Sequence, residues 1–240
     1  VAPPGVDETG IAGAFRGAPL EMVKCETIDV EVPANAEIVI EGVVVPDETA
    51  TDGPFGEFPG NYITFLRSTR VEAPIVKVTA ITMRKNPIFQ TMLTGMPLPM
   101  TENHVLRKWA VLTAAYREAS KHAEVKAITA TPGSGGQTHI LIAIKKRADE
   151  EPKNIINALF NYLRSTKHIV VVDDDINIYD PAEVEWALAT RMQADKDMII
   201  IPAGKPPVPA KWGIDATMPL QDRQWYRRIN VPGVDRVDYI

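Results

Sequence analysis

The sequence predicts an α+β protein whose second half belongs to the α/β class, and two observations lead to this prediction. Residues 20 to about 95 are rich in β-branched residues and interrupted by Pro and Gly, which favours antiparallel strands that form part of a barrel. From about residue 101, helical segments alternate with apolar strand-like segments. Strands that are joined by helices and covered on both faces are typical of a mainly parallel sheet.

Two strands are expected in the first half. Residues 36–45 alternate between acidic and aliphatic side chains before Pro46, and residues 75–83 alternate again before Pro87. A period of two residues is typical of a strand with one buried face. No convincing helix lies between these two segments.

A helix is expected from Glu102 to about Lys121, with Thr101 as its N-terminal cap. Apolar side chains recur along it with the helical period, which predicts one buried stripe on a single face. The stripe consists of Val105, Leu106, Trp109, Leu112, Thr113 and Tyr116.

Further helices and strands alternate along the second half. Pro152 suits the first turn of a helix, and Asp180 can cap another that continues with Pro181 and Glu183. The first of these helices should bury one face, made of Ile155, Ile156, Leu159, Phe160 and Leu163. Strands are expected at residues 125–131, 139–145, 168–172 and 198–201, and residues 202–209 are expected to form a loop.

Composition restricts the class of protein. Hydrophobic residues make up 45% and charged residues 24% of the 240 residues, which is typical of a globular protein. The net charge of −5 argues against a nucleic-acid partner. The single cysteine, Cys25, cannot form an internal disulfide, which suits a reducing cytoplasm. No apolar run is long enough for a membrane span, and no signal peptide is visible.

The most unusual segment is residues 52–57, DGPFGE. Its two glycines and one proline impose a tight backbone and place the carboxylates of Asp52 and Glu57 five positions apart. Two acids held close together or away from water have raised pKa values and can deliver a proton near neutral pH. A polar surface turn between strands is the commoner explanation of such a composition, so spacing alone leaves both interpretations open.

The motifs of this chain resemble those of the UbiD family of decarboxylases. The family's central pattern is EIVxEG, then ET, then EGPFG followed by Glu or Asp, and it is similar to residues 37–42, 48–49 and 52–57 here. The resemblance continues in order along nearly the whole chain, at residues 15–17, 21–25, 60–62, 94–97, 144–147, 171–176, 186–191 and 212–217. It implies the end of a flavin-reductase-like split β-barrel up to about residue 100, followed by a C-terminal α/β domain over residues 101–240 that associates into a homo-oligomer.

The resemblance also implies a reaction and a cofactor. UbiD enzymes carry out a reversible, non-oxidative decarboxylation of aromatic or α,β-unsaturated carboxylic acids through a covalent adduct with prenylated FMN. By position, Glu57 matches the acid that donates the proton and Asp52 matches the first acid of the catalytic network. Phe58 and Thr94 are expected to line the substrate pocket. Of the lysine pair Lys145 and Lys146, one is expected to reach the flavin phosphate.

This chain departs from the family pattern in two ways. Most relatives have Glu where this chain has Asp52, whose side chain is one methylene shorter. The family's catalytic arginine, and most ligands of the manganese and potassium ions that accompany the flavin, precede the part matched here. The chain starts at Val1 rather than Met, so something was removed or the chain is a piece of a longer protein. The N-terminal half of the enzyme is therefore an expected partner. The alternative is an inactive fragment, or a scaffold or oligomerisation subunit.

Four other groups of residues have less specific patterns. Residues 131–136, TPGSGG, lack the Lys-Ser/Thr ending and the following helix of a phosphate-binding loop and are expected to be a turn. Asp173, Asp174 and Asp175 could attract Mg²⁺, although a structural role is preferred, because consecutive residues at a strand end point in opposite directions. The histidines lack metal-ligand spacing, and Cys25 is expected to be a small buried residue rather than a nucleophile. These histidines are His104, which could line the site but is expected at the surface, and His122, His139 and His168.

Overall fold

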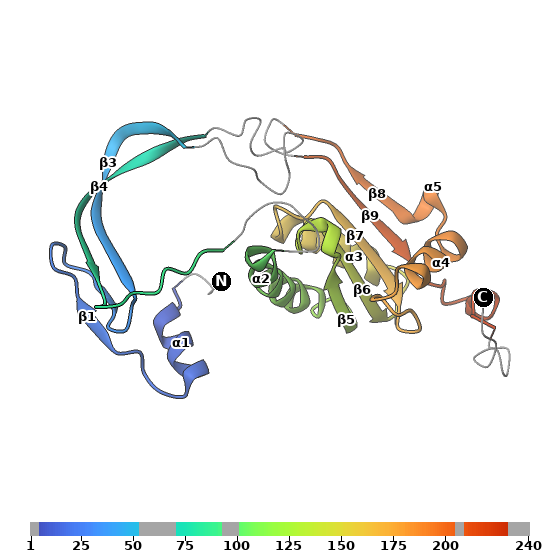
Figure 1. The fold of residues 1–240 in the computed structure, drawn as a ribbon. Coiled ribbons are helices and arrows are strands. Elements are labelled where there is room, and N and C mark those ends of the chain that lie inside the picture. The colour runs from blue at the N-terminus through green and yellow to red at the C-terminus, as the bar shows by residue number, and fades with distance from the viewer. Residues whose placement is uncertain (1–4, 53–70, 93–100, 205–208, 230–240) are drawn as a thin grey trace, which may run out of the picture. The chain divides into compact units, whose positions relative to one another are not determined.

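The computed structural model describes residues 5–52, 71–92, 101–204 and 209–229 of the chain. It divides the chain into two compact units, Val1–Gly95 and Met96–Ile240. Figure 1 shows the helices and strands of both units.

The first unit opens with a helix that sequence reasoning missed, α1 (Glu8–Arg16). The carboxylate of Asp7 accepts a hydrogen bond from the backbone N–H of Thr9, and Gly17 ends the helix in the left-handed region at φ 74°. Two short antiparallel strands follow, β1 (Met22–Lys24) and β2 (Glu31–Pro33). An acidic cap at one end and glycine at the other are ordinary helix signals, so the sequence did contain this helix.

A long antiparallel pair dominates the first unit: β3 (Ile38–Asp52) and β4 (Val71–Met83). The pairing confirms the antiparallel prediction, but β3 does not end at Pro46 as expected. It continues to Asp52 across a register shift between Val44 and Thr49, and Asp47 within this bulge has φ 63°. A bulge accommodates proline because its residues are outside the hydrogen-bonded ladder. The split β-barrel remains a prediction.

The second unit contains a five-stranded sheet in the order β5-β6-β7-β9-β8. Its strands are β5 (Glu124–Ala130), β6 (His139–Lys145), β7 (His168–Asp173), β8 (Met198–Ile201) and β9 (Lys211–Ala216). Strands β6, β7 and β9 are parallel, whereas β5 and β8 pair antiparallel at the two edges. The sheet is therefore mixed, and the prediction of a mainly parallel sheet was wrong at both edges. The reason is connection length, because β5 reaches β6, and β8 reaches β9, without a crossover helix.

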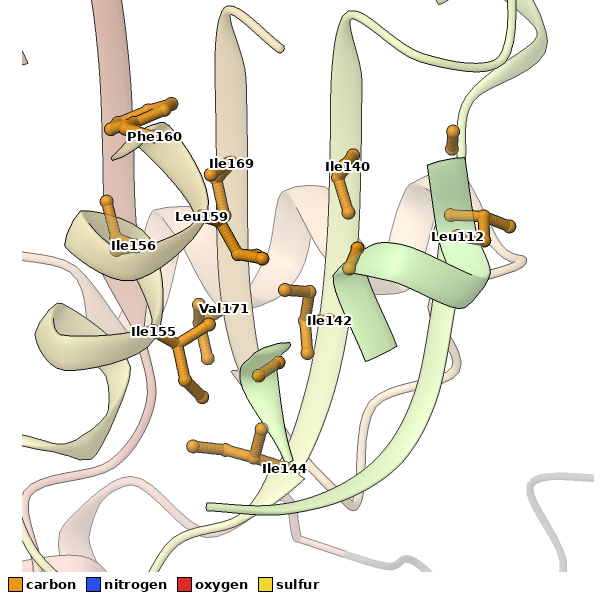
Figure 2. Close-up of a cluster of buried hydrophobic side chains, with 13 residues drawn as sticks. Leu112, Ile140, Ile142, Ile144, Ile155, Ile156, Leu159, Phe160, Ile169 and Val171 are labelled. Carbon is orange, nitrogen blue, oxygen red and sulfur yellow. The ribbon is translucent and has the colours of Figure 1, made fainter. Parts of the chain in front are cut away.

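Helices cover both faces of this sheet. On one face, α2 (Glu102–Ala119) and α3 (Glu151–Tyr162) enclose a core with the strands. Figure 2 shows side chains of α3 and of the central strands in this core, among them Ile155, Leu159, Ile142 and Val171. On the other face, α4 (Pro181–Arg191) packs over a second cluster that includes Val170 and Ile214. A short helix, α5 (Ala194–Asp197), precedes β8.

The boundaries of α2 agree with the sequence, but its buried face does not. Of the predicted stripe only Leu112 is buried, while Leu106 and Trp109 are 61% and 67% exposed. The buried residues of α2 are His104, Leu112, Ala115 and Ala119. Alanine lets a helix approach its neighbours closely, so α2 packs largely through small side chains and leaves Leu106 and Trp109 outside. Both faces of α2 are apolar, and periodicity alone could not choose between them.

Two short 3₁₀ turns complete the described elements, η2 (Pro132–Ser134) and η3 (Arg223–Trp225). The first lies in the connection between β5 and β6, as the predicted turn at residues 131–136, and Gly135 and Gly136 both have positive φ there. No helix within the described residues is long and apolar enough to cross a membrane.

Candidate active site

Asp52 is the last residue of β3, and it is exposed. Its backbone lies opposite Val71, the first residue of β4. Next to it, the hydroxyl of Thr51 donates a hydrogen bond of 2.8 Å to Glu72 across the strand pair. The two strands therefore hold Asp52 at the start of residues 52–57, which we call the acid-bearing segment. Its carboxylate is available to a ligand or to a neighbouring side chain.

Three of the predicted site residues lie outside the part of the chain that the structure describes. Glu57 and Phe58 belong to residues 53–70 and Thr94 belongs to residues 93–100, and both segments lie outside the described residues. Their roles remain predictions.

A buried carboxylate that sequence reasoning did not single out lies near the start of β3. Glu41 is 2% exposed and accepts hydrogen bonds from the backbone N–H groups of Glu26 and Thr27 and from the Thr27 hydroxyl, at 2.6 to 2.8 Å. The side-chain hydrogen bond from Thr27 is the main cause of the lowered pKa of Glu41. Glu41 thus fastens the loop between β1 and β2 to the strand pair.

A cavity of about 210 Å³ lies beside this carboxylate. Its lining includes Val23, Cys25, Val39, Glu41 and Arg84. Burial raises the pKa of the Cys25 thiol, with the negative charge of Glu41 contributing. A thiol with a raised pKa is a poor nucleophile near neutral pH, which agrees with the expected structural role. Cys25 is partly rather than fully buried.

The two lysines at the end of β6 have different environments. Lys145 is exposed. Lys146 is buried: its ammonium group lies 2.8 Å from an Asp149 carboxylate oxygen and donates a hydrogen bond of 3.0 Å to the Thr217 hydroxyl. An exposed ammonium group at a strand end can bind a phosphate as a point charge, so Lys145 fits that role better than Lys146.

The acidic run after β7 serves an ion-pair network. Asp173 is fully buried and lies 3.0 Å from Arg191, which is also buried, and 3.1 Å from Arg223. Burial raises the pKa of Asp173 despite both arginines. Burial acts to raise the pKa of Asp175, but the hydrogen bond and positive charge of Arg191, 2.6 Å away, are the main reasons that this pKa is lowered. These contacts support the structural role that was predicted for the acidic run, residues 173–175, in preference to a Mg²⁺ site.

Two of the four histidines, His139 and His168, lie together. His104 is only 3% exposed and its Nδ1 lies 3.1 Å from the Thr101 hydroxyl, so the expectation of a surface position was wrong. His139 and His168 lie on β6 and β7 beside Trp212. Among the residues that the structure describes, no group of three or more His, Cys, Asp or Glu side chains could hold a metal ion.

Comparisons with known proteins agree along most of the chain. Residues 1–97 match the 3-octaprenyl-4-hydroxybenzoate carboxy-lyase Rift-related domain of UbiD, and residues 104–213 match the corresponding C-terminal domain. Among curated proteins, the chain is similar to an anhydromevalonate phosphate decarboxylase of Methanosarcina mazei, with 33% identity over 239 residues that cover 95% of this chain and 54% of the relative. The chain spans about half the length of the curated relatives it matches.

Solved structures give the same result. The UbiD-class enzyme HmfF from Pelotomaculum thermopropionicum, in complex with FMN, superimposes with a TM-score of 0.83 and 40% identity over 99% of this chain and 54% of that protein. An evolved dimeric form of HmfF in complex with prenylated FMN matches with a TM-score of 0.83 and 41% identity over 99% of this chain and 52% of that protein.

Proposed function

The chain belongs to the UbiD family, and from this premise we propose that it takes part in the reversible, non-oxidative decarboxylation of an aromatic or α,β-unsaturated carboxylic acid. The observation that carries the proposal is the superposition of 99% of the chain on HmfF at 40% identity, a structure that contains FMN. The position of Asp52 adds support, because β3 holds an exposed carboxylate where the acid-bearing segment begins.

Each predicted site residue has a distinct role in this proposal. Glu57 donates the proton to the carbon that loses carbon dioxide, and Asp52 supports it. Phe58 and Thr94 line the substrate pocket. Lys145, the exposed member of its pair, binds the flavin phosphate. Prenylated FMN, when bound, supplies the covalent chemistry that lets carbon dioxide leave.

Completion of the site requires residues from outside this chain. We infer that the N-terminal half of the enzyme contributes the catalytic arginine and most ligands of the manganese and potassium ions. In support, the chain corresponds to about half of its relatives. The paired strands β3 and β4 also expose Ile40, Val44, Val78 and Ile81, each by more than half. Two-stranded sheets are marginally stable by themselves, so further strands from that half would complete this one.

Residues 1–100 would then form the flavin-binding barrel, and residues 101–240 would form the domain through which copies associate into a homo-oligomer. HmfF has been solved in an evolved dimeric form, and this supports self-association. A cytoplasmic location suits the single cysteine.

The test replaces Glu57 by Gln in the enzyme assembled with its N-terminal half and loaded with prenylated FMN. General acids contribute about 10²- to 10⁴-fold to rate, so carbon dioxide release should fall by about that factor. The flavin absorbance of the purified protein should not change, because the substitution keeps size and polarity. Glu48→Gln is the matched control: Glu48 lies on β3 and pairs with Lys77 at 3.4 Å, and its loss should leave turnover intact.

Retained turnover in Glu57→Gln would remove Glu57 from the role of proton donor. If the assembled wild-type protein binds flavin but releases no carbon dioxide from any aromatic or unsaturated acid, the alternative of a scaffold or oligomerisation subunit replaces the enzymatic proposal.

A further inference from the structure

Residues 217–228, which follow β9, are attached to the sheet at several separate points. The first attachment is at the end of β9 itself. The hydroxyl and the backbone N–H of Thr217 both donate to the buried carboxylate of Asp215, at 2.6 and 2.9 Å. The next residue, Met218, is buried, and its N–H donates to Asp173 at 2.6 Å. The ends of β9 and β7 thus bind the consecutive residues Thr217 and Met218.

The end of β6 provides the second attachment. Lys146 reaches the Thr217 hydroxyl at 3.0 Å and Asp149 at 2.8 Å. The same Asp149 oxygen accepts a hydrogen bond of 3.1 Å from the backbone N–H of Leu220. The side chain of Lys146 is only 2% exposed. The buried lysine therefore links β6 to residues 217–220, both directly and through Asp149.

Two arginines attach the remainder of the segment. Arg223 pairs with the buried carboxylate of Asp173 at 3.1 Å. Arg228 pairs with Glu183 of α4 at 3.0 Å, and its guanidinium lies 4.9 Å from the centre of the Trp186 ring. In Figure 1 the chain leaves β9 beside α4 on its way to the C-terminus. The attachments are spread over the ends of three neighbouring strands and one helix.

We propose that residues 217–228 form a strap that closes the carboxyl edge of strands β6, β7 and β9, and that this strap is released as one unit when an attachment is broken. Open α/β sheets meet their ligands at the carboxyl ends of their parallel strands. Here the chain itself occupies that place and uses the polar groups found there, Lys146, Asp173 and Asp215. The proposal does not depend on the decarboxylase function.

Cooperative release has a physical cause in Asp173. One buried carboxylate receives Met218, Arg223 and Arg191 together. Loss of Arg223 removes one of the positive charges that offset the desolvation cost of this buried carboxylate. It therefore weakens the site that binds the N–H of Met218. The effect should reach Leu220 and Lys146, although Arg223 contacts neither of them.

Lysine acetylation followed by mass spectrometry of the 240-residue chain tests the strap, with sulfo-NHS-acetate as the reagent. In the wild-type protein Lys145 should be modified rapidly and Lys146 slowly, because their exposures differ. In Arg223→Ala the modification rate of Lys146 should rise about tenfold, the effect expected from one lost hydrogen bond to a charged group. Lys211 is an internal control: it is 8% exposed and donates to carbonyl oxygens of Phe160 and Leu163, away from the strap.

Arg227→Ala is the matched control variant, because Arg227 is exposed and has no ion pair among the residues that the structure describes. It should leave the rate at Lys146 unchanged. Hydrogen exchange should accelerate over residues 217–228 together in Arg223→Ala. If acceleration stays within residues 222–224 and Lys146 remains protected, the attachments act independently and the strap proposal is overturned.

Arg228→Ala gives a second test from the other end of the strap, in case Arg223→Ala loses its fold and Lys146 and Lys211 react faster together. A rise at Lys146 with Lys211 still protected supports the strap. Protection of both lysines in a folded Arg228→Ala protein contradicts it.

Discussion

The ring cluster of His139, His168 and Trp212 shows how burial changes the pKa of single side chains. They occupy paired positions on β6, β7 and β9. The rings of His168 and Trp212 are stacked with centroids 4.4 Å apart, and His139 meets His168 edge-on at 5.5 Å. Burial lowers the pKa of His139 to about 4, with the charge of His168 contributing. Burial also lowers the pKa of His168, with Lys167 contributing. Both imidazoles are therefore neutral at pH 7.

These two histidines predict a loss of stability in mild acid. A base whose pKa is lower in the folded state stabilises the fold fully above its unfolded pKa of about 6.5, and this contribution is lost as the pH falls toward the folded value. The free energy of unfolding should therefore decrease between pH 6.5 and pH 5, by up to about 2 kcal/mol for His139 alone. Urea unfolding at several pH values measures this decrease.

His139→Phe keeps an aromatic ring but removes the proton-binding site, so its free energy of unfolding should change less between pH 6.5 and 5 than that of the wild type. His122→Phe is the control, because His122 is one-third exposed and lies outside this ring cluster. An unchanged pH slope in His139→Phe would show that burial of this imidazole does not control the acid response.

Several residues of the family motifs have a structural role in this fold. Glu41 holds the loop after β1, and Arg191 is buried between Asp173 and Asp175. The pattern of the sequence identified their segments, but not their partners, which lie 14 to 18 positions away. Lys146 also has a partner that the sequence pattern did not identify, because Thr217 lies 71 positions away. Partners so distant in sequence become visible only in the folded chain.

At the scale of elements, α3 and β9 approach each other closely at Gly213. A Cβ atom added at Gly213 would lie 2.3 Å from Cγ2 of Ile156, whereas real Cβ contacts are longer than 3.0 Å. Ile156 is fully buried in the core between α3 and the sheet. Only glycine at this position lets the helix pack against the strand at this distance.

Gly213→Ala should therefore destabilise the protein by about 1–3 kcal/mol, as overpacking of a core usually does. Thermal unfolding followed by circular dichroism would show a lower Tm. Gly133→Ala provides the comparison, because nothing lies within 4 Å of its added Cβ and its φ is not positive. Equal Tm values for the two variants would mean that α3 can move away from β9 without loss of stability.

Element positions were largely predictable from sequence. Strand β6 and strand β8 have their predicted bounds, and α3 buries Ile155, Ile156, Leu159 and Phe160 as expected. Strand β9 was missed, although residues 212–217 were noted as a motif, because Gly213 and Asp215 interrupt its apolar pattern. Tertiary contacts supply what the pattern lacks: Gly213 receives α3, and Asp215 binds Thr217.

At the scale of the whole molecule, the two units differ in the cores that they contain. Among the residues that the structure describes, every buried hydrophobic side chain lies between Leu112 and Met218, within the second unit. In the first unit, Glu41 is buried but the apolar side chains of β3 and β4 are largely exposed. Within the described residues, the second unit therefore has its own hydrophobic core, whereas exposed apolar side chains of β3 and β4 would need additional surface to cover them.

Separate expression of residues 96–240 and residues 1–95 should reveal this difference. The larger fragment is expected to unfold in one cooperative transition and to give a dispersed amide NMR spectrum, because a hydrophobic core of this kind supports independent folding. The smaller fragment is expected to give a poorly dispersed spectrum, since a strand pair without a covered face is marginally stable. Cooperative unfolding of residues 1–95 alone would contradict this account.

The sequence by itself determined the family and most of the strands and helices of the second half, but not α5 or β9. These features depend on local patterns: apolar periodicity, capping residues and contiguous motifs. Tertiary structure alone decided that the edge strands run antiparallel, that α2 buries its small side chains, and that Lys146 and Asp173 hold the chain after β9. Each of these outcomes depends on contacts between segments far apart in sequence, and a local pattern is equally compatible with either alternative until packing selects one.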